Sequence, residues 1–335
     1  MRSRQFDENV SQYCNLNLSR MSMRTTWKAP RELPVLLLLL ITTLIMGLFV
    51  PAFRTESNLT ALGESAAYIG ILACGEALPL FTAGLDISVG STLALSSCAA
   101  ATVLTLGWPW PIAAAVGLLA GACAGWFNGM LITWRRMPPI LATLATFLIF
   151  RHGAGILTHD HSYGPFPHAF NRIGSGWVPV LLLVAITLLF TFLVQRATFG
   201  RWLLSVGGNE MAARLSAVPI EKVKRRAYLL CGLCAGLAGL IVMAFNNTTQ
   251  ASVGQGTELD AIAACVVGGT RITGGEGSVV GAALGAVLLA LLRDAFVLTG
   301  RPVSQYGVIT GGVILLTAIL ERLRRANINL QEETV

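Results

Sequence analysis

The sequence predicts an all-α integral membrane protein with about ten transmembrane helices. Hydrophobic residues make up 54% of the chain and charged residues only 12%, whereas soluble domains carry about 25% charged residues. The apolar residues form long continuous runs, and about 20 helical residues cross a hydrocarbon core. A closed barrel is the other architecture that spans a bilayer. Continuous rather than alternating apolar runs favour helices.

The apolar runs predict the spans in order. Predicted spans are 33–51, 60–82, 87–106, 111–133, 138–157, 177–194, 227–245, 259–267, 278–298 and 303–320. The eighth is short, so it is expected to be either incomplete or re-entrant. The transmembrane domain then covers residues 33–321, between polar tails at 1–32 and 322–335. One substantial hydrophilic loop, 195–226, interrupts it.

Glycines mark two expected breaks in the spans, near residues 83–90 and 268–277. The second break lies between two apolar runs and contains Gly268, Gly269, Gly274 and Gly275. Such a polar, glycine-rich stretch between apolar runs predicts a tight turn that joins two helical segments. Its glycines allow both segments to pack closely on neighbouring helices. The fourth span has one glycine every four residues, which predicts a flat face for helix packing: Gly117, Gly121, Gly125 and Gly129.

The basic residues predict the orientation. With ten spans and a cytoplasmic N-terminus, nineteen Lys and Arg residues lie on the inner side and five on the outer side. Basic residues concentrate in cytoplasmic loops, so both termini are expected in the cytoplasm. The net charge of +7 follows from this bias and does not indicate a nucleic-acid partner.

Several acids lie in or beside the apolar runs, where a lipid-facing carboxylate costs about 2.5–3.5 kcal/mol. The predicted pathway and gating residues are Glu76, Asp86, Ser88, Ser91, Glu258, Asp260, Gly274 and Gly275. Helix capping is the alternative role for Asp86, at the start of the third span, and for Glu258 and Asp260. An ion-coupled secondary transporter that uses Glu76 or Asp86 is the alternative function.

Other reactive residue types give weaker signals. Cys231 and Cys234 form a CxxC pair, but Leu, Gly and Ala flank it and no further ligands are evident. The cysteines are therefore interpreted as buried apolar residues, with no metal predicted. His159, His161 and His168 share one polar loop and are expected to be solvated. No Ser/His or His/Asp set shares one depth, which argues against an intramembrane enzyme.

The inner loop 195–226 is the strongest candidate for contact with a partner. Asn209 followed by an amphipathic run to Ser216 predicts a capped short helix outside the membrane. An ordinary connector whose arginines set the topology is the alternative. The predicted coupling residues are Gly200, Arg201, Gly207, Gly208, Asn209, Ala212 and Ala213.

Four segments, in order, carry a resemblance to a known family. They are GILACGEALPLFTAGLDISVGS (70–91), PPILATLATFLIFRHG (138–153), TFGRWLLSVGGNEMAARLSAVPIEKVK (198–224) and ELDAIAACVVGGTRITGGEGSVVGAALGA (258–286). The chain resembles the permease subunits of ATP-binding-cassette importers for ribose and other monosaccharides, in the branched-chain amino acid and carbohydrate permease superfamily. It departs from the family pattern at Glu76, usually neutral, at Ala217, usually Gly, and at Arg271, usually small or polar.

The resemblance implies the function and the partners. Two permeases, identical or related, would form the pathway in a bacterial inner membrane, surrounded by lipid. A cytoplasmic ATPase subunit would bind ATP, and a periplasmic solute-binding protein would deliver a sugar or sugar-like solute. The chain itself contains no GxxxxGK[ST] nucleotide-binding motif, so no cofactor is predicted for it.

Overall fold

The computed structural model describes residues 32–302, 305–312, 315 and 319. Its elements are α2 (Leu33–Phe49), η1 (Pro51–Arg54), α3 (Glu56–Phe81), α4 (Val89–Thr105), α5 (Trp110–Trp134), α6 (Pro139–Thr158), α7 (His168–Asn171), η2 (Arg172–Gly174), α8 (Val178–Gln195), α9 (Thr198–Gly208), α10 (Glu210–Leu215), α11 (Ile220–Asn246), α12 (Thr257–Val267) and α13 (Val279–Leu298). Residues 305–312 are helical as well.

The described part of the chain confirms the all-α membrane class. Six of its helices are long and apolar enough to cross a membrane, namely α3, α5, α6, α8, α11 and α13. Two shorter apolar helices, α2 and α4, have 17 residues each and therefore rise about 26 Å at 1.5 Å per residue. The order of spans follows the prediction. Part of the tenth span and most of both tails lie outside the described residues.

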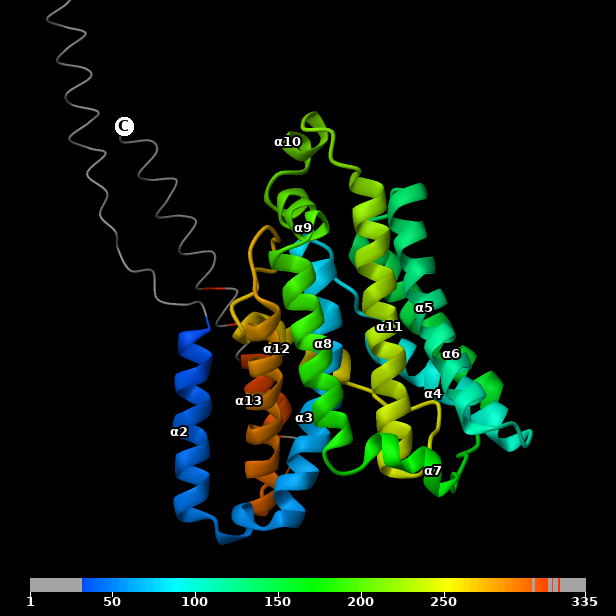
Figure 1. Cartoon of the computed structure of the whole chain (residues 1–335), viewed down its shortest axis with the longest axis vertical. Coiled ribbons are helices and arrows are strands. Elements are labelled where there is room, and N and C mark those ends of the chain that lie inside the picture. Colours follow the sequence, from blue (N-terminus) through cyan, green and yellow to red (C-terminus); the bar gives the residue numbers. More distant parts are fainter. Residues whose placement is uncertain (1–31, 303–304, 313–314, 316–318, 320–335) are drawn as a thin grey trace, which may run out of the picture. The chain divides into compact units, whose positions relative to one another are not determined.

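The helices form a bundle with two recognisable ends (Figure 1). The short helix α10 (Glu210–Leu215) lies at one end and α7 at the other, so we call these the α10 end and the α7 end. Helices α3 and α11 are the most buried of the long helices. In contrast, α8 exposes Leu181, Leu188 and Phe192. An apolar surface of this kind suits contact with lipid.

Helix α11 begins at Ile220, seven residues before the predicted start of the seventh span at residue 227. Hydropathy marks only the apolar part of a helix, and residues 221–226 are mostly charged. Ile220 and Val223 are nevertheless buried, so this first stretch is helical and amphipathic. The hydrophilic loop is correspondingly shorter than the predicted 195–226.

The eighth crossing is not a single continuous helix. Helix α12 has 11 residues, a rise of about 16 Å, against a hydrocarbon core of about 30 Å. Residues 247–256, which precede it, are not helical. The expected breaks near 83–90 and 268–277 are also present, because residues 82–88 and 268–278 lie outside helices.

Candidate functional site

A buried polar cluster fills the break between α3 and α4. Glu76 is 0% exposed and Asp86 is 1% exposed. The backbone amide of Asp86 donates to Glu76 Oε1 at 3.0 Å. The amide and the hydroxyl of Ser88 both donate to Asp86 Oδ1, at 2.9 and 2.6 Å. Buried carboxyls are tolerated when such hydrogen bonds satisfy them.

Neighbouring helices close this cluster. Asn128 of α5 donates from Nδ2 to Ser88 Oγ at 2.7 Å and lies 3.3 Å from both carboxylate oxygens of Asp86. Cys231 of α11 lies 3.5 Å from Glu76 Oε2. The unusual acid at position 76 therefore has a structural partner in the turn that follows α3. Whether the cluster also lines the pathway stays a prediction.

Asp86 does not cap α4 in the predicted way. Helix α4 begins at Val89, its N-cap is Ser88, and no side chain caps it. Asp86 instead binds the amide and hydroxyl of Ser88 two residues on, which fixes the turn before the helix. The Ser91 hydroxyl is buried and donates to the carbonyl of Ser88 at 2.8 Å.

The four glycines of α5 face close neighbours. A Cβ atom at Gly121 would lie 2.5 Å from the carbonyl oxygen of Gly232 and 2.8 Å from Gly236 Cα, both on α11. A Cβ at Gly125 would lie 2.9 Å from Gly232 Cα. Gly117 and Gly129 are also tightly placed, against Leu240 and Arg225. Glycines therefore meet glycines where α5 and α11 approach.

The glycine-rich break packs on the end of α9. Gly274 and Gly275 have φ of +81° and +78°, a conformation that favours glycine. The amide of Gly275 donates to the carbonyl of Phe81, the last residue of α3, at 3.0 Å. A Cβ atom at Gly207 of α9 would collide with that same oxygen, whereas one at Gly208 would meet nothing within 4 Å. Gly200 packs against the end of α8 at Val194.

Two side chains bridge or border this break. Arg271 Nη1 pairs with Glu276 Oε1 at 3.0 Å, so the unusual arginine at 271 has an acidic partner within the break. A Cβ atom at Gly274 would lie 2.5 Å from the amide of Ala83. The 268–277 break thus touches both the end of α3 and the turn that leads to Asp86.

Helix α10 is the predicted short helix, and its cap is confirmed. The amide of Ala212 donates to Asn209 Oδ1 at 3.0 Å. Lys224 of α11 pairs with Glu210 Oε2 at 2.7 Å. This hydrogen bond is the main reason that the pKa of the Glu210 carboxyl lies below its usual value. Ala213 is buried, while Arg201 is exposed.

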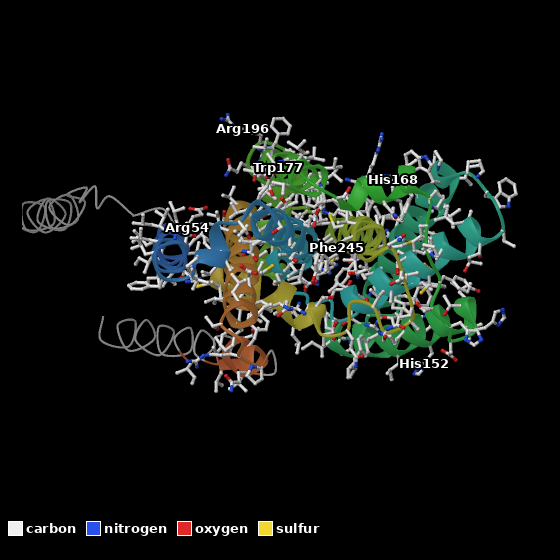
Figure 2. All side chains as sticks on the ribbon, turned by 90° about the horizontal axis from the view of Figure 1, so that it is seen from below. Arg54, His152, His168, Trp177, Arg196 and Phe245 are labelled. Atoms are coloured by element: carbon white, nitrogen blue, oxygen red, sulfur yellow. The ribbon has the colours of Figure 1, made fainter. Side chains whose placement is uncertain are left out.

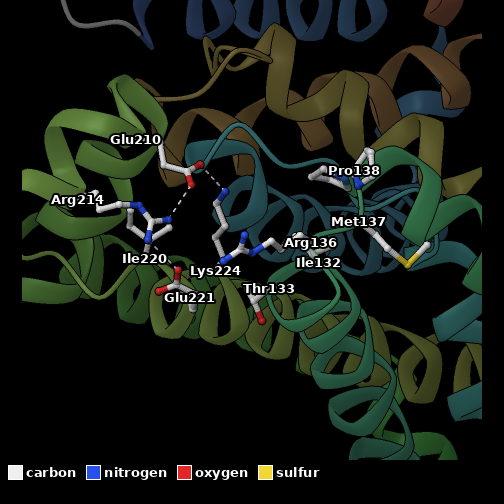
Figure 3. Close-up of a pocket in the computed structure, with 11 residues that line it drawn as sticks. Ile132, Thr133, Arg136, Met137, Pro138, Glu210, Arg214, Ile220, Glu221 and Lys224 are labelled. Atoms are coloured by element: carbon white, nitrogen blue, oxygen red, sulfur yellow. Dashed lines mark hydrogen bonds and ion pairs between the residues drawn. The ribbon is translucent and has the colours of Figure 1, made fainter.

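A groove of about 480 Å³ opens at the α10 end of the bundle (Figure 3). The link from α5 to α6 forms one side, with Arg136 and Met137, and α10 and α11 form the other. Glu210, Arg214 and Glu221 line it, and Arg214 pairs with both acids, at 3.5 and 3.2 Å. The groove is therefore charged but internally paired.

The two acids at the start of α12 point to different partners. Glu258 Oε1 accepts from the amide of Gly256 at 3.1 Å, which is a local capping contact. Its Oε2 lies so close to Gly90, in the first turn of α4, that no Cβ fits there. Asp260 Oδ1 accepts from the hydroxyl of Tyr306 at 3.1 Å.

The links that contain η1 and α7 lie at the α7 end. Figure 2 views the bundle from this side and labels Arg54 of η1, His168 of α7 and Trp177. His159 and His161 are exposed, as expected for a solvated loop. Among the described residues no group of three His, Cys, Asp or Glu side chains is placed to hold a metal ion, and Cys231 and Cys234 are free and buried.

Sequence reasoning missed three polar residues that the structure places at key contacts. Asn128 is an isolated polar side chain in the glycine-lined fourth span, and a polar residue in an otherwise apolar span indicates a buried hydrogen-bond partner. Arg151 lies within the predicted fifth span, 138–157, and its charge there was the available signal. Tyr306 lies at the start of the tenth span, and its hydroxyl reaches Asp260 across 46 residues of sequence.

The four resembling segments meet in this structure, and a comparison with known families agrees with them. Residues 58–318 match the model of the family described as the branched-chain amino acid transport system permease component. The chain belongs to this family.

Named members of the family are similar along most of their length. The permease is 34% identical over 297 residues to the ribose import permease protein RbsC of Escherichia coli K12, covering 85% of this chain and 91% of that one. It is 31% identical over 306 residues to the autoinducer 2 import system permease protein LsrC of Photorhabdus luminescens, covering 88% and 91%. A putative metal-chelate type ABC transporter, solved in an inward-facing conformation, aligns with a TM-score of 0.47 at 14% identity, covering 88% and 98%.

Proposed function

We propose that this permease is the membrane subunit of an ATP-driven bacterial importer for a sugar or sugar-like solute. Relatives that share about a third of its residues are named for the import of ribose and of autoinducer 2. In this account a separate ATPase binds the nucleotide, a solute-binding protein delivers the solute from outside, and a second permease copy completes the pathway. The permease then lies in the bacterial inner membrane, with both termini and α10 on the cytoplasmic side.

The exposed apolar side chains of α10 are the main support for a contact with the ATPase. Met211 and Leu215 of α10 are 68% and 84% exposed, although the helix lies outside the spans. Residues four apart share one helix face, so the two form a small apolar surface. Apolar side chains gathered on an exposed face typically mark an interaction site. We assign this face, with the adjoining groove, to the ATPase.

The contacts of α9 suggest how movement of α10 reaches the pathway. Gly207 near the end of α9 abuts both Phe81 and Gly275, so a shift of α9 displaces the end of α3 and the 268–277 break together. The turn that follows Phe81 holds Asp86 and leads into α4. Packed elements of this kind change between discrete arrangements rather than deforming continuously. Alternating access would use these two breaks.

The ion-coupled alternative gains no support from the acids on which it depends. Glu76 Oε1 accepts from the amide of Asp86, and Oε2 lies beside Cys231. Asp86 receives hydrogen bonds from Ser88 and Asn128. Carboxylates already occupied by protein donors fit a structural role better than an ion site.

A crosslinking experiment tests the assignment of α10. A photoreactive amino acid at Met211 or Leu215 is expected to crosslink the ATPase subunit encoded with this permease, when both are expressed in the same cells. The matched control is Leu106, the C-cap residue of α4, which is 71% exposed. Equal crosslinking from Leu106, or none from either α10 position, would refute the assignment.

A further inference from the structure

Residues 247–256, here called the entry segment, run alongside α4 without forming a helix. The hydroxyl of Thr249 donates to Ser97 Oγ at 2.9 Å, and Ser97 lies eight residues from either end of α4, about 12 Å at 1.5 Å per residue. Farther along, Gly254 abuts Leu93 and Gly90. The segment therefore follows α4 from its middle to its first turn.

The non-helical backbone of the entry segment needs partners for its polar groups if it lies within the bilayer. In a bilayer such backbone occurs only where protein buries it or where it lines a water-filled cavity. Four polar side chains of the entry segment are exposed: Thr248, Gln250, Ser252 and Gln255. Lipid tails would leave their hydrogen-bonding groups unsatisfied, which points to an aqueous surface on this face of the segment.

Arg151 of α6 holds the entry segment in place. Its Nη1 donates to the carbonyl oxygens of Ala251 and Val253, at 2.8 and 2.6 Å. The remaining guanidinium nitrogens, Nε and Nη2, are buried without a hydrogen-bond partner, and the guanidinium carbon lies 5.6 Å from the centre of the Phe147 ring. Arg151 lies twelve residues after Pro139, about 18 Å along α6. A charged side chain this deep in a span typically marks a solute or ion pathway.

Glu258 supplies the complementary group. The residue is 8% exposed, and its Oε2 is buried without a partner, directly against Gly90. Gly90 and Glu258 belong to the first turns of α4 and α12, so the carboxylate lies where the partial positive charges of two helix N-termini converge. Arg151 and Glu258 interact electrostatically, yet no ion pair within 4 Å joins them in the described residues.

We propose that Arg151, Glu258 and the entry segment form a solute-binding subsite inside the membrane that accepts a neutral polyhydroxylated molecule. The inference rests on the proposed function and names the solute chemistry at one place in the pathway. A hydroxyl group donates one hydrogen bond and accepts others, so it matches an unpaired carboxylate oxygen and unpaired guanidinium nitrogens together.

Charge balance separates this solute class from solutes that carry a net charge. The subsite holds one positive and one negative side chain. An anionic solute would face Glu258, and a cationic solute would face Arg151, without compensation. The unpaired atoms of both residues are covered in this structure, so solute reaches them only when the first turns of α4 and α12 move apart.

Thiol labelling tests the subsite directly. Ser252 is replaced by Cys in the permease assembled with its ATPase and binding protein in proteoliposomes, and labelling by a membrane-impermeant methanethiosulfonate is followed. Labelling above that of the parent chain is expected, and D-ribose at saturating concentration should slow it severalfold. Leu144→Cys, on an exposed apolar face of α6, is the matched control and should stay unlabelled. Absence of labelling at 252, or labelling that D-ribose does not slow, overturns the subsite.

Protection should also depend on the two charged groups. Glu258→Gln, introduced with Ser252→Cys, is expected to abolish protection by D-ribose, while Glu56→Gln at the exposed start of α3 leaves it intact. Arg151→Lys should weaken protection, because a lysine cannot offer the same fork of donors. Protection that is unchanged in both Glu258→Gln and Arg151→Lys overturns the subsite. If the subsite is overturned in this way but the wild-type assembly still takes up labelled D-ribose, the proposed function is retained. If the wild-type assembly takes up none of the sugars tested, the proposed function is itself overturned.

Discussion

The amide of Gly275 donates a 3.0 Å hydrogen bond to the carbonyl of Phe81, so the glycine-rich break is fastened to the last residue of α3. Gly207 of α9 presses on the same oxygen. Three segments far apart in sequence therefore share one contact at the α10 end of the bundle. Under the proposed coupling, movement of α10 and α9 reaches the two breaks through this contact.

Gly207→Ala should impair transport because the new methyl group has no space beside Phe81 and Gly275. We expect ATP-driven uptake in proteoliposomes to fall by about tenfold or more, equivalent to at least about 1.4 kcal/mol on the transport barrier. Gly208→Ala is the matched control, since its Cβ would meet nothing within 4 Å, and it should transport at a near-normal rate. Similar uptake by both variants would contradict the role of this contact.

Ala217→Gly should stabilise the end of α10. Ala217 has φ of +58° directly after the C-cap Ser216, a left-handed position that costs a non-glycine residue about 1–2 kcal/mol. Hydrogen exchange of the amides in 210–218 should slow by about fivefold, as about 1 kcal/mol of relieved strain predicts. Ala212→Gly, inside the helix, should speed exchange instead. Faster exchange in Ala217→Gly would refute the strain.

Gly121→Ala should destabilise the bundle by about 1–3 kcal/mol, because overpacking forces the backbones of α5 and α11 apart. The Cβ at Gly121 would meet backbone atoms of Gly232 and Gly236, which cannot rotate away. Gly153→Ala in α6 is the comparison, since its nearest neighbour would be Leu95 Cδ1 at 3.7 Å, and it should be neutral or stabilising by up to about 1 kcal/mol. Thermal unfolding of the two purified variants in detergent compares their stabilities. An equal effect on Tm would argue against the close helix approach.

Asn128→Ala should lower stability by about 1–3 kcal/mol, because Ser88 and Asp86 lose a buried donor. Thr105→Ala removes only a local hydrogen bond to Thr102 at an exposed position and should change the free energy of unfolding by less than about 0.5 kcal/mol. Both are measured by thermal unfolding of the purified permease. A silent Asn128→Ala would show that the cluster does not depend on this amide.

Much of the fold could be predicted because lipid imposes simple rules on a sequence. Continuous apolar runs give the spans, and the glycines near 268–277 mark the second break. Asn209 predicts the cap of α10 from its own chemistry. The early start of α11 at Ile220 was missed because hydropathy does not detect a helix that continues beyond the membrane.

The composition of the site was harder to predict, since it depends on contacts between distant residues. Nothing local to Glu76 indicates that the amide of Asp86 will bind it. The entry segment falls in the polar link between the predicted seventh and eighth spans, and its composition does not reveal its contacts. Only the contacts with Ser97 and Arg151 place it at depth, and a single sequence does not record them.

The central claim is that this permease moves solute only when a separate ATPase supplies the energy. The most direct measurement compares uptake of labelled D-ribose and related sugars into proteoliposomes that contain the permease alone or the permease with its ATPase and binding protein, each with ATP and with an imposed proton gradient. We expect accumulation only with the full set of subunits and ATP. Accumulation by the permease alone, driven by the proton gradient, would contradict the account.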